Sequence, residues 1–470
     1  MKDIVKIAWR NLWRNKTRTV ITAVVVFIGV ILAAVMSSQQ YGIYDTMIDN
    51  VIGFSGNIQV LNEDYWENKT INNSLEYSDS LTSLIGATDH VSLVTPRLES
   101  FALASNGDIT KGILVAGIDA EKEDELNNYS QKIVRFKITE EVLENIQREN
   151  PGKEIIQSLA SLKGRSFISD ERLEANIEDL FDKKQEEKVL ALMKKYSRYP
   201  GSKFEKNDNG VILGERLAEY LQLDINDTLV LISQGYHGVS AAGLYPVKGL
   251  VKIPSPDLER RLVYMEINTC MEFYSTENRV TSLVVKVDRN SKTMKALEGL
   301  KAKLPEGYTA MSWQETQPEM VNMIEGDKAG GYFMKGIFYI IVGFIIFSTI
   351  MMMMAERKRE FGIMIAVGMQ KLRLSLIVFF ETLFIGIIGS VFGLLASIPL
   401  LSFLKHNPIP LQGDMAKMME DFGFEAVLYF SNNADIFYWQ PLIIFIMVMI
   451  IFIFPIYIIR KLKIMNAIRG

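Results

Sequence analysis

Apolar residues gather in four long stretches that charged residues almost entirely avoid. They span 19–44, 336–355, 374–404 and 436–459, and Glu381 is the one charged side chain within them. A helix that crosses about 30 Å of hydrocarbon needs roughly 20 apolar residues. The pattern therefore predicts four transmembrane helices. Buried helices of a soluble protein seldom run this far without charge. A cleaved signal peptide is an alternative for the first stretch only, and its apolar run is too long for one.

The 290 residues between the first two stretches alternate strand-like and helical patterns. Runs such as 56–61, 111–119 and 281–287 predict strands, with a turn at 106–108. We expect one α+β domain across 45–334, built from halves at about 45–119 and 276–315, with a lobe inserted at about 120–275. Residues 314–335 predict a helical stalk, in which Gly330 and Gly331 form either a hinge or a break at the membrane surface.

The distribution of charge predicts the topology. Basic residues dominate 1–18, 355–373 and 460–470, which therefore face the cytoplasm. Residues 45–334 carry 33 basic and 46 acidic residues, and the loop 405–435 is also acidic, so both lie outside. We expect both termini in the cytoplasm and the large domain in the periplasm.

Composition excludes several kinds of function. The single cysteine, Cys270, excludes a disulfide framework and a cysteine-rich metal site, and the three histidines are too dispersed to bind a metal. A net charge of −4 gives no general attraction to nucleic acid. No phosphate-binding loop of the G-x-x-x-x-G-K-[ST] type occurs, so we expect no ATPase, no catalytic residues and no cofactor in this chain.

Residues 1–18 form an amphipathic pattern. Trp9 and Trp13 lie one turn apart, while Lys6, Arg10 and Arg14 recur every four residues on another face. This pattern is typical of a helix that lies at the membrane surface. Its role is either contact with the lipid alone or contact with a further partner.

The loop 355–373 combines charged residues with apolar ones. Phe361, Met364, Ile365 and Val367 stand among basic residues, and Gly368 ends the run as a helix C-cap would. This predicts a short cytoplasmic helix with an exposed apolar face. Such a face either docks into a groove of another protein or folds back onto the bilayer.

The third apolar stretch contains small residues and one carboxylate. Gly389 and Gly393 have the spacing that permits close helix packing, with Gly386 one turn earlier. They pack helices either within one chain or between two. Glu381 requires a partner or the interface, because an unpaired carboxylate in the membrane costs several kcal/mol. It has either a structural or a transport role.

The order of spans, together with several motifs, resembles the FtsX-like permeases of the MacB and lipoprotein-release (LolC/LolE) type. The motifs are KIAWRNLWRNKTRTVIT (6–22), GNIQVLNEDYW (56–66), GVILGERLAEYLQLDINDTLVL (210–231), TSLVVKVD (281–288), YTAMSWQE (308–315), REFGIMIAVGMQK (359–371) and FFETLFIGIIGSVFGLL (379–395). The chain departs from this family at Met465, where proline is usual, and in a longer, more helical segment at 120–205.

The resemblance implies the permease subunit of an ABC transporter in the inner membrane. Partners would be a separate ATPase subunit, a second permease in a homo- or heterodimer, and a periplasmic lipoprotein carrier or an outer-membrane component. ATP would move the loop around Phe361, and the helices would transmit that motion to the external domain. The residues expected to couple to the ATPase are Arg359, Glu360, Phe361, Gly362, Met364, Ala366 and Gly368.

Lipoprotein release is the first expectation for the transport function. MacB-like efflux of peptides, toxins or drugs is one alternative. A protein that regulates periplasmic hydrolases without transporting anything is another.

Overall fold

The computed structural model describes residues 2–461 except 15, 179, 412, 414, 416–418 and 420–426. The chain forms two compact units. The helical unit comprises Met1–Ile48, Glu319–Gln412 and Ala426–Gly470, and the sheet unit comprises Asp49–Pro318 and Gly413–Glu425. Most of the predicted tail 460–470, including Met465, and much of the loop 405–435 lie outside the described residues.

The helical unit confirms the four predicted apolar helices by length and composition. The apolar stretches lie at Thr19–Ser55, Pro318–Ala366, Lys371–His406 and Ala434–Lys461. The helices of this unit are α1 (Lys2–Arg14), α2 (Lys16–Ser55), α14 (Pro318–Ala366), α15 (Lys371–His406), α17 (Ala434–Ile451) and α18 (Ile453–Lys461). They enclose a shared apolar core, to which α2 contributes Val26, α14 Ile346, α15 Val378 and α17 Ile444.

The small residues of α15 pack against other helices of the same chain. A Cβ atom at Gly389 would lie 2.6 Å from Val26 Cβ, and one at Gly393 would lie 2.8 Å from Val30 Cβ, both on α2. Gly386 faces α17 instead, where a Cβ atom would lie 3.4 Å from Phe445. The glycine spacing therefore lets α15 and α2 approach closely within one chain.

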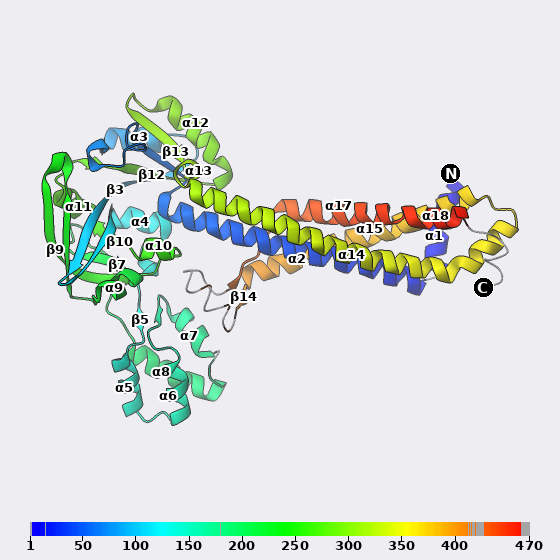
Figure 1. The fold of residues 1–470 in the computed structure, drawn as a ribbon, viewed down its shortest axis with the longest axis horizontal. Helices are drawn as coiled ribbons and strands as arrows, with labels where there is room; N and C mark the ends of the chain where they lie inside the picture. Colours follow the sequence, from blue (N-terminus) through cyan, green and yellow to red (C-terminus); the bar gives the residue numbers. More distant parts are fainter. Residues whose placement is uncertain are drawn as a thin grey trace. The chain divides into compact units, whose positions relative to one another are not determined.

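Helix α14 is a single helix of 49 residues, so the predicted stalk, second span and start of the cytoplasmic loop are continuous (Figure 1). Of the two alternatives for Gly330 and Gly331, the break is wrong, whereas the hinge stays a prediction. A Cβ atom at Gly331 would lie 1.5 Å from the side chain of Gln40, whereas nothing lies within 4 Å of that position at Gly330. Gly331 therefore lets α14 pack closely on α2, and it does not interrupt the helix.

The sheet unit is built on a nine-stranded sheet in the order β13-β1-β12-β3-β4-β10-β7-β9-β8. The strands are β1 (Ile58–Asn62), β3 (Val91–Asn106), β4 (Ile109–Ile118), β7 (Val211–Gly214), β8 (Thr228–Gln234), β9 (Ser240–Val251), β10 (Leu262–Glu266), β12 (Ser282–Val287) and β13 (Tyr308–Ser312). The 16-residue β3 pairs with β12 near its start and with β8 near its end, so the last strand in the order, β8, also pairs with a strand in the middle of the sheet.

Short helices and smaller pairings complete the sheet unit. The helices are α3 (Asp79–Gly86), α4 (Ala120–Asn127), α9 (Glu215–Leu221), α10 (Pro256–Glu259), α11 (Ile267–Tyr274), α12 (Thr293–Lys303) and α13 (Trp313–Thr316). Strands β2 (Leu75–Glu76) and β11 (Arg279–Val280) pair with each other.

In the helical unit, β14 (Ile409–Pro410) and β15 (Val427–Leu428) pair likewise. Gly107, with φ of +60°, makes the predicted turn between β3 and β4.

The inserted lobe is smaller than the sequence predicts. Strands β7 to β10 lie within the predicted lobe at 120–275, yet they belong to the main sheet. Among the described residues of the predicted lobe, a core separate from the main sheet spans only the segment from Phe136 to Tyr196. Its elements are β5 (Phe136–Lys137), α5 (Glu140–Arg148), α6 (Lys153–Ala160), β6 (Ser166–Phe167), α7 (Asp170–Glu178) and α8 (Lys183–Tyr196). The other strands of the predicted lobe belong to the main sheet because β10 pairs with β4, and the sequence pattern does not predict that pairing.

Candidate functional site: anchors at the ends of the long helices

Two long helices enter the sheet unit through neighbouring strands. Helix α2 ends at Ser55 and β1 begins three residues later, while β13 leads through α13 into α14. Strands β1 and β13 pair antiparallel over five residues, from Ile58 opposite Ser312 to Asn62 opposite Tyr308. The backbone turns between α2 and β1 at Gly56, whose φ of +71° favours glycine, and a Cβ atom there would lie 2.4 Å from Val284.

Asn57 joins the end of α2 to three neighbouring segments. Its buried side chain accepts a hydrogen bond from Val287 N at 2.9 Å and donates one to Asn290 Oδ1 at 2.9 Å. Its backbone carbonyl accepts a hydrogen bond from Trp313 N at 3.0 Å. Trp313 opens α13, where Ser312 and Glu315 form a reciprocal capping box. One asparagine therefore connects the exit of α2 to the entry of α14.

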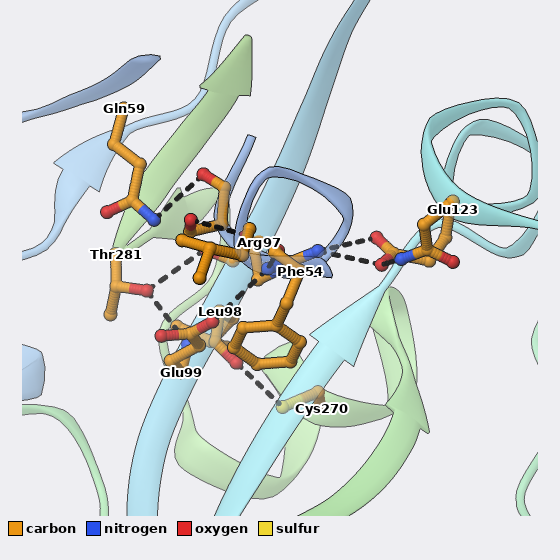
Figure 2. A network of polar contacts seen from close by, with 11 residues as sticks. Phe54, Gln59, Arg97, Leu98, Glu99, Glu123, Cys270 and Thr281 are labelled. Carbon is orange, nitrogen blue, oxygen red and sulfur yellow. Dashed lines mark hydrogen bonds and ion pairs between the residues drawn. The ribbon is translucent and has the colours of Figure 1, made fainter. Parts of the chain in front are cut away.

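Arg97 on β3 binds the carboxyl end of α2 (Figure 2). Its guanidinium is fully buried, donates to the carbonyl oxygen of Phe54 and lies 4.8 Å from the centre of the Phe54 ring. Gln59 Nε2 donates to the next carbonyl, Ser55 O, at 3.1 Å. The last carbonyls of a helix lack partners within the helix and carry partial negative charge, so a buried cation at this position stabilises the helix end.

The charge of Arg97 is balanced by carboxylates. Its Nη2 donates to both oxygens of Glu123 on α4, at 2.7 and 2.9 Å, and its Nη1 lies 3.5 Å from Glu99 Oε1. Burial by itself would lower the pKa of Arg97, but Glu123 and Glu99 raise it above its ordinary value. Burial also raises the pKa of Glu99, and the charge of Arg97 partly offsets that effect. The Arg97–Glu123 pair therefore links β3, α4 and the end of α2.

A second buried pair, in the helical unit, joins three helices. Arg357 on α14 donates to both carboxylate oxygens of Glu381 on α15, and the Nη2 contact measures 3.3 Å. Asn11 on α1 donates to Glu381 Oε1 at 2.7 Å. The side chains of Arg357 and Glu381 are 6% and 3% exposed. Glu381 is therefore a paired carboxylate, which agrees with the structural alternative that the sequence left open.

The contacts of this pair extend toward the surface through Glu360. Its Oε2 lies 3.4 Å from Arg357 Nε and 3.5 Å from Arg14 Nη2. Both Glu360 and Arg14 are exposed enough for water to screen this contact, so it contributes little to stability. It nevertheless places α1, α14 and α15 in one polar network beside the turn that connects α14 to α15.

The turn between α14 and α15 corrects the predicted docking face. Phe361 is fully buried in the core of the helical unit, with its ring 5.1 Å from the Arg357 guanidinium, and Gly362 is buried too. The expectation that Phe361 is exposed is wrong. Helix α14 continues to Ala366, and its period places Phe361 on the face that packs in the core of the helical unit.

The apolar surface of the turn comes from neighbouring residues. Val367 is 84% exposed, and Ile363 and Leu372 are also exposed. Of the other predicted coupling residues, Arg359, Ala366 and Gly368 are exposed and Met364 is half-buried. Gly368 has φ of +103° and its N–H donates to Ile365 O, so it ends α14 as a left-handed C-cap, as the sequence predicts.

Comparison with known families identifies the helical part of the chain. Residues 332–466 match the family model described as FtsX-like permease C-terminal. Residues 332–466 therefore form an FtsX-like permease domain, of a family whose members are transmembrane components of ABC transporters. The match covers α15, α17 and most of α14, including Arg357 and Glu381.

Two solved structures are each similar to a part of the chain. The periplasmic region of MacB from Actinobacillus actinomycetemcomitans has 13% identity, covers 59% of this chain and 98% of that one, and gives a TM-score of 0.30. The extracellular domain of the noncanonic ABC-type transporter YknZ from Gram-positive bacteria has 11% identity, 54% and 99% coverage and a TM-score of 0.28. Scores this low do not establish a shared fold. The comparison with curated protein sequences gives no match.

The sequence marks only part of these two anchors. It indicates Glu381 and Glu360 but not Asn11, and the signal for Arg357 is its position close before a membrane hairpin, where a basic residue is a candidate partner for Glu381. No local pattern assigns a role to Glu123 or Asn57. For Arg97, its place as a lone arginine within the strand-like run 91–105 is the available signal, because a buried strand carries a charge only when that charge is paired.

Proposed function

We propose that the chain is the permease subunit of an ABC transporter and that it works by mechanotransmission. A separate ATPase subunit would bind the turn between α14 and α15, and ATP binding would shift that turn. Helices α14 and α2 would pass the shift to the external sheet, without a path for the substrate through the bilayer. ATP hydrolysis would occur on the partner, and a second permease, identical or different, would complete the transporter.

The pairing of β1 with β13 is the observation that carries this proposal. Strand β1 follows α2 after two residues, strand β13 leads through the short α13 into α14, and five residue pairs join the two strands. Sliding one strand past the other would break this ladder and move side chains to the wrong face of the sheet. Displacement of either helix at its strand end would therefore move the sheet rather than be absorbed in a flexible linker.

The exposed turn supports the docking role. Val367, Ile363 and Leu372 present apolar surface, with Lys358, Arg359 and Arg373 exposed nearby along the chain. An exposed apolar knob with a charged rim suits insertion into a groove of a soluble partner. The positive charge of this segment supports a cytoplasmic position, with both termini on the same side and the sheet unit in the periplasm.

Docking is tested with Val367→Asp in the full chain. The buried charge should weaken ATPase association by about 2–4 kcal/mol, on the order of 30-fold or more, while membrane insertion persists. Val367→Met is the matched control, because it keeps the apolar contact. Unchanged co-purification of the ATPase with the aspartate variant would remove the turn from the docking site.

Lipoprotein release is the transport function that we propose. One face of the sheet unit leaves Phe101 and Leu244 64% and 69% exposed, with Leu103 and Ile232 exposed on paired positions of β3 and β8. Exposed apolar clusters of this kind mark binding surfaces, and a lipid-modified protein has acyl chains to offer. A periplasmic carrier or an outer-membrane component would receive the cargo.

Depletion of the protein distinguishes this function from its competitor. Lipoproteins should accumulate in the inner membrane, measured by membrane fractionation and immunoblotting. MacB-like efflux predicts instead a changed sensitivity to drugs or peptides with normal lipoprotein distribution. That second result would refute lipoprotein release but leave the mechanotransmission proposal in place.

A further inference from the structure

An apolar groove with two cationic residues lies between α1 and α15. It is lined by Lys2, Val5, Lys6, Trp9, Phe380 and Phe384. We propose that this groove binds an anionic phospholipid from the membrane leaflet next to α1. Lys2 and Lys6 would bind the lipid phosphate, and an acyl chain would lie along the aromatic rings.

The aromatic part of the groove suits an acyl chain. Phe380 and Phe384 lie one turn apart on α15, a helix long and apolar enough to cross a membrane. The Trp9 ring packs edge-on against Phe384, with the ring centres 5.4 Å apart, yet Trp9 remains 46% exposed. An indole beside a membrane helix lies at the level of the lipid headgroups. The bilayer is therefore the source of apolar material nearest to this surface.

The charge beside the groove selects the headgroup. Lys2, Lys6 and Arg10 follow one another at four-residue spacing on α1, and the ion pairs found among the described residues involve none of them. Arg14, one turn further, is already paired with Glu360. The described residues that line the groove include no carboxylate. Uncompensated positive charge attracts an anionic lipid, whereas a zwitterionic lipid brings its own cation and gains less.

The position of the groove suggests what the lipid would do. Helix α1 holds Glu381 through Asn11, so a lipid that fills the space between α1 and α15 would brace the same helices as the polar network. Lipid composition would then modulate the coupling of the permease. The binding proposal itself does not depend on the identity of the cargo or on the transport mechanism.

Intact-protein mass spectrometry of the full chain in mild detergent tests the site. Dioleoylphosphatidylglycerol should bind more tightly than dioleoylphosphatidylcholine. The double variant Lys2→Gln/Lys6→Gln should weaken phosphatidylglycerol binding on the order of 30-fold and weaken phosphatidylcholine binding much less. The control Lys358→Gln/Arg373→Gln removes the same charge from exposed positions outside the groove and should keep the affinity of the unmodified protein.

A third variant separates the groove from its charge. Trp9→Ala removes one wall while keeping both lysines, so it should weaken both lipids. Three results would overturn the proposal. The first is an equal loss of phosphatidylglycerol affinity in the two double variants, and the second is no loss of that affinity in Lys2→Gln/Lys6→Gln. The third is weaker ATPase binding by Lys2→Gln/Lys6→Gln with unchanged lipid binding, which would make the groove a protein docking site.

Discussion

The two buried arginine–glutamate pairs do similar chemistry in different surroundings. Arg97 and Glu123 are both fully enclosed, and Arg97 also binds the end of α2. Arg357 and Glu381 are almost as buried, but Glu360 and Arg14 continue their network to an exposed surface. A fully enclosed pair fixes the position of a helix end. A pair whose contacts reach an exposed residue can exchange partners when a protein binds beside it. This property fits the turn between α14 and α15, where we propose that the ATPase docks.

The largest effect is expected from Glu123→Ala. It leaves the fully buried Arg97 with only the partly exposed Glu99 as a counter-charge, and breaking such a pair costs about 3–5 kcal/mol. The midpoint of thermal unfolding of the sheet unit, followed in the full chain in detergent, should fall by roughly 6–20 °C. Glu125→Ala, on an exposed position of the same helix, should leave it unchanged. A fall of only a degree or two would mean that Arg97 does not anchor α2 through its charge.

The sequence predicted elements that depend on local pattern. The four apolar helices, the turn at Gly107 and the C-cap at Gly368 all follow from residues close together in the chain. It failed where the outcome depends on distant residues. The strands β7 to β10 were assigned to a separate lobe, because strand periodicity does not reveal which strand is the neighbour.

The misplaced Phe361 shows the same limit within a helix. Four apolar residues among charges predicted an exposed face, but the direction of that face depends on where α14 ends. Since α14 continues to Ala366, Phe361 points inward and Val367 outward. The two partners of Glu381 differ in this respect. Arg357 lies 24 residues away, just before the hairpin, where a basic residue is a usable signal, whereas Asn11 lies 370 residues away and nothing local marks that pairing.

A smaller loss of stability is expected from Glu381→Leu, and it sharpens the contrast. Arg357 would lose its main counter-charge but keep Glu360, so the cost should be about 2–3 kcal/mol, measured as a lower unfolding midpoint. Arg357→Met combined with Glu381→Leu should recover most of that stability, because an apolar pair replaces the buried ion pair. If the pair relays motion, the double variant should remain stable and bind the ATPase, yet lose permease-stimulated ATP hydrolysis. Normal stimulation would make the pair purely structural.

The smallest effect concerns a buried carboxylate that lacks full compensation. Glu259 lies beside Glu215, and although Arg216 and Lys252 contact the two carboxylates, burial and then the charge of Glu215 raise the pKa of Glu259 to about 7. An unfolded glutamate titrates near pH 4.3. The folded state therefore holds this proton over a range where the unfolded state has lost it, so stability is greatest below about pH 4.3 and falls until about pH 7. Between pH 5 and 7 the loss of folding stability should be about 2 kcal/mol.

The variant Glu259→Gln, which cannot ionise, tests this pH dependence and should flatten that part of the curve of unfolding midpoint against pH. An unchanged slope would show that Arg216 and Lys252 balance the two carboxylates as completely as Arg97 balances Glu123.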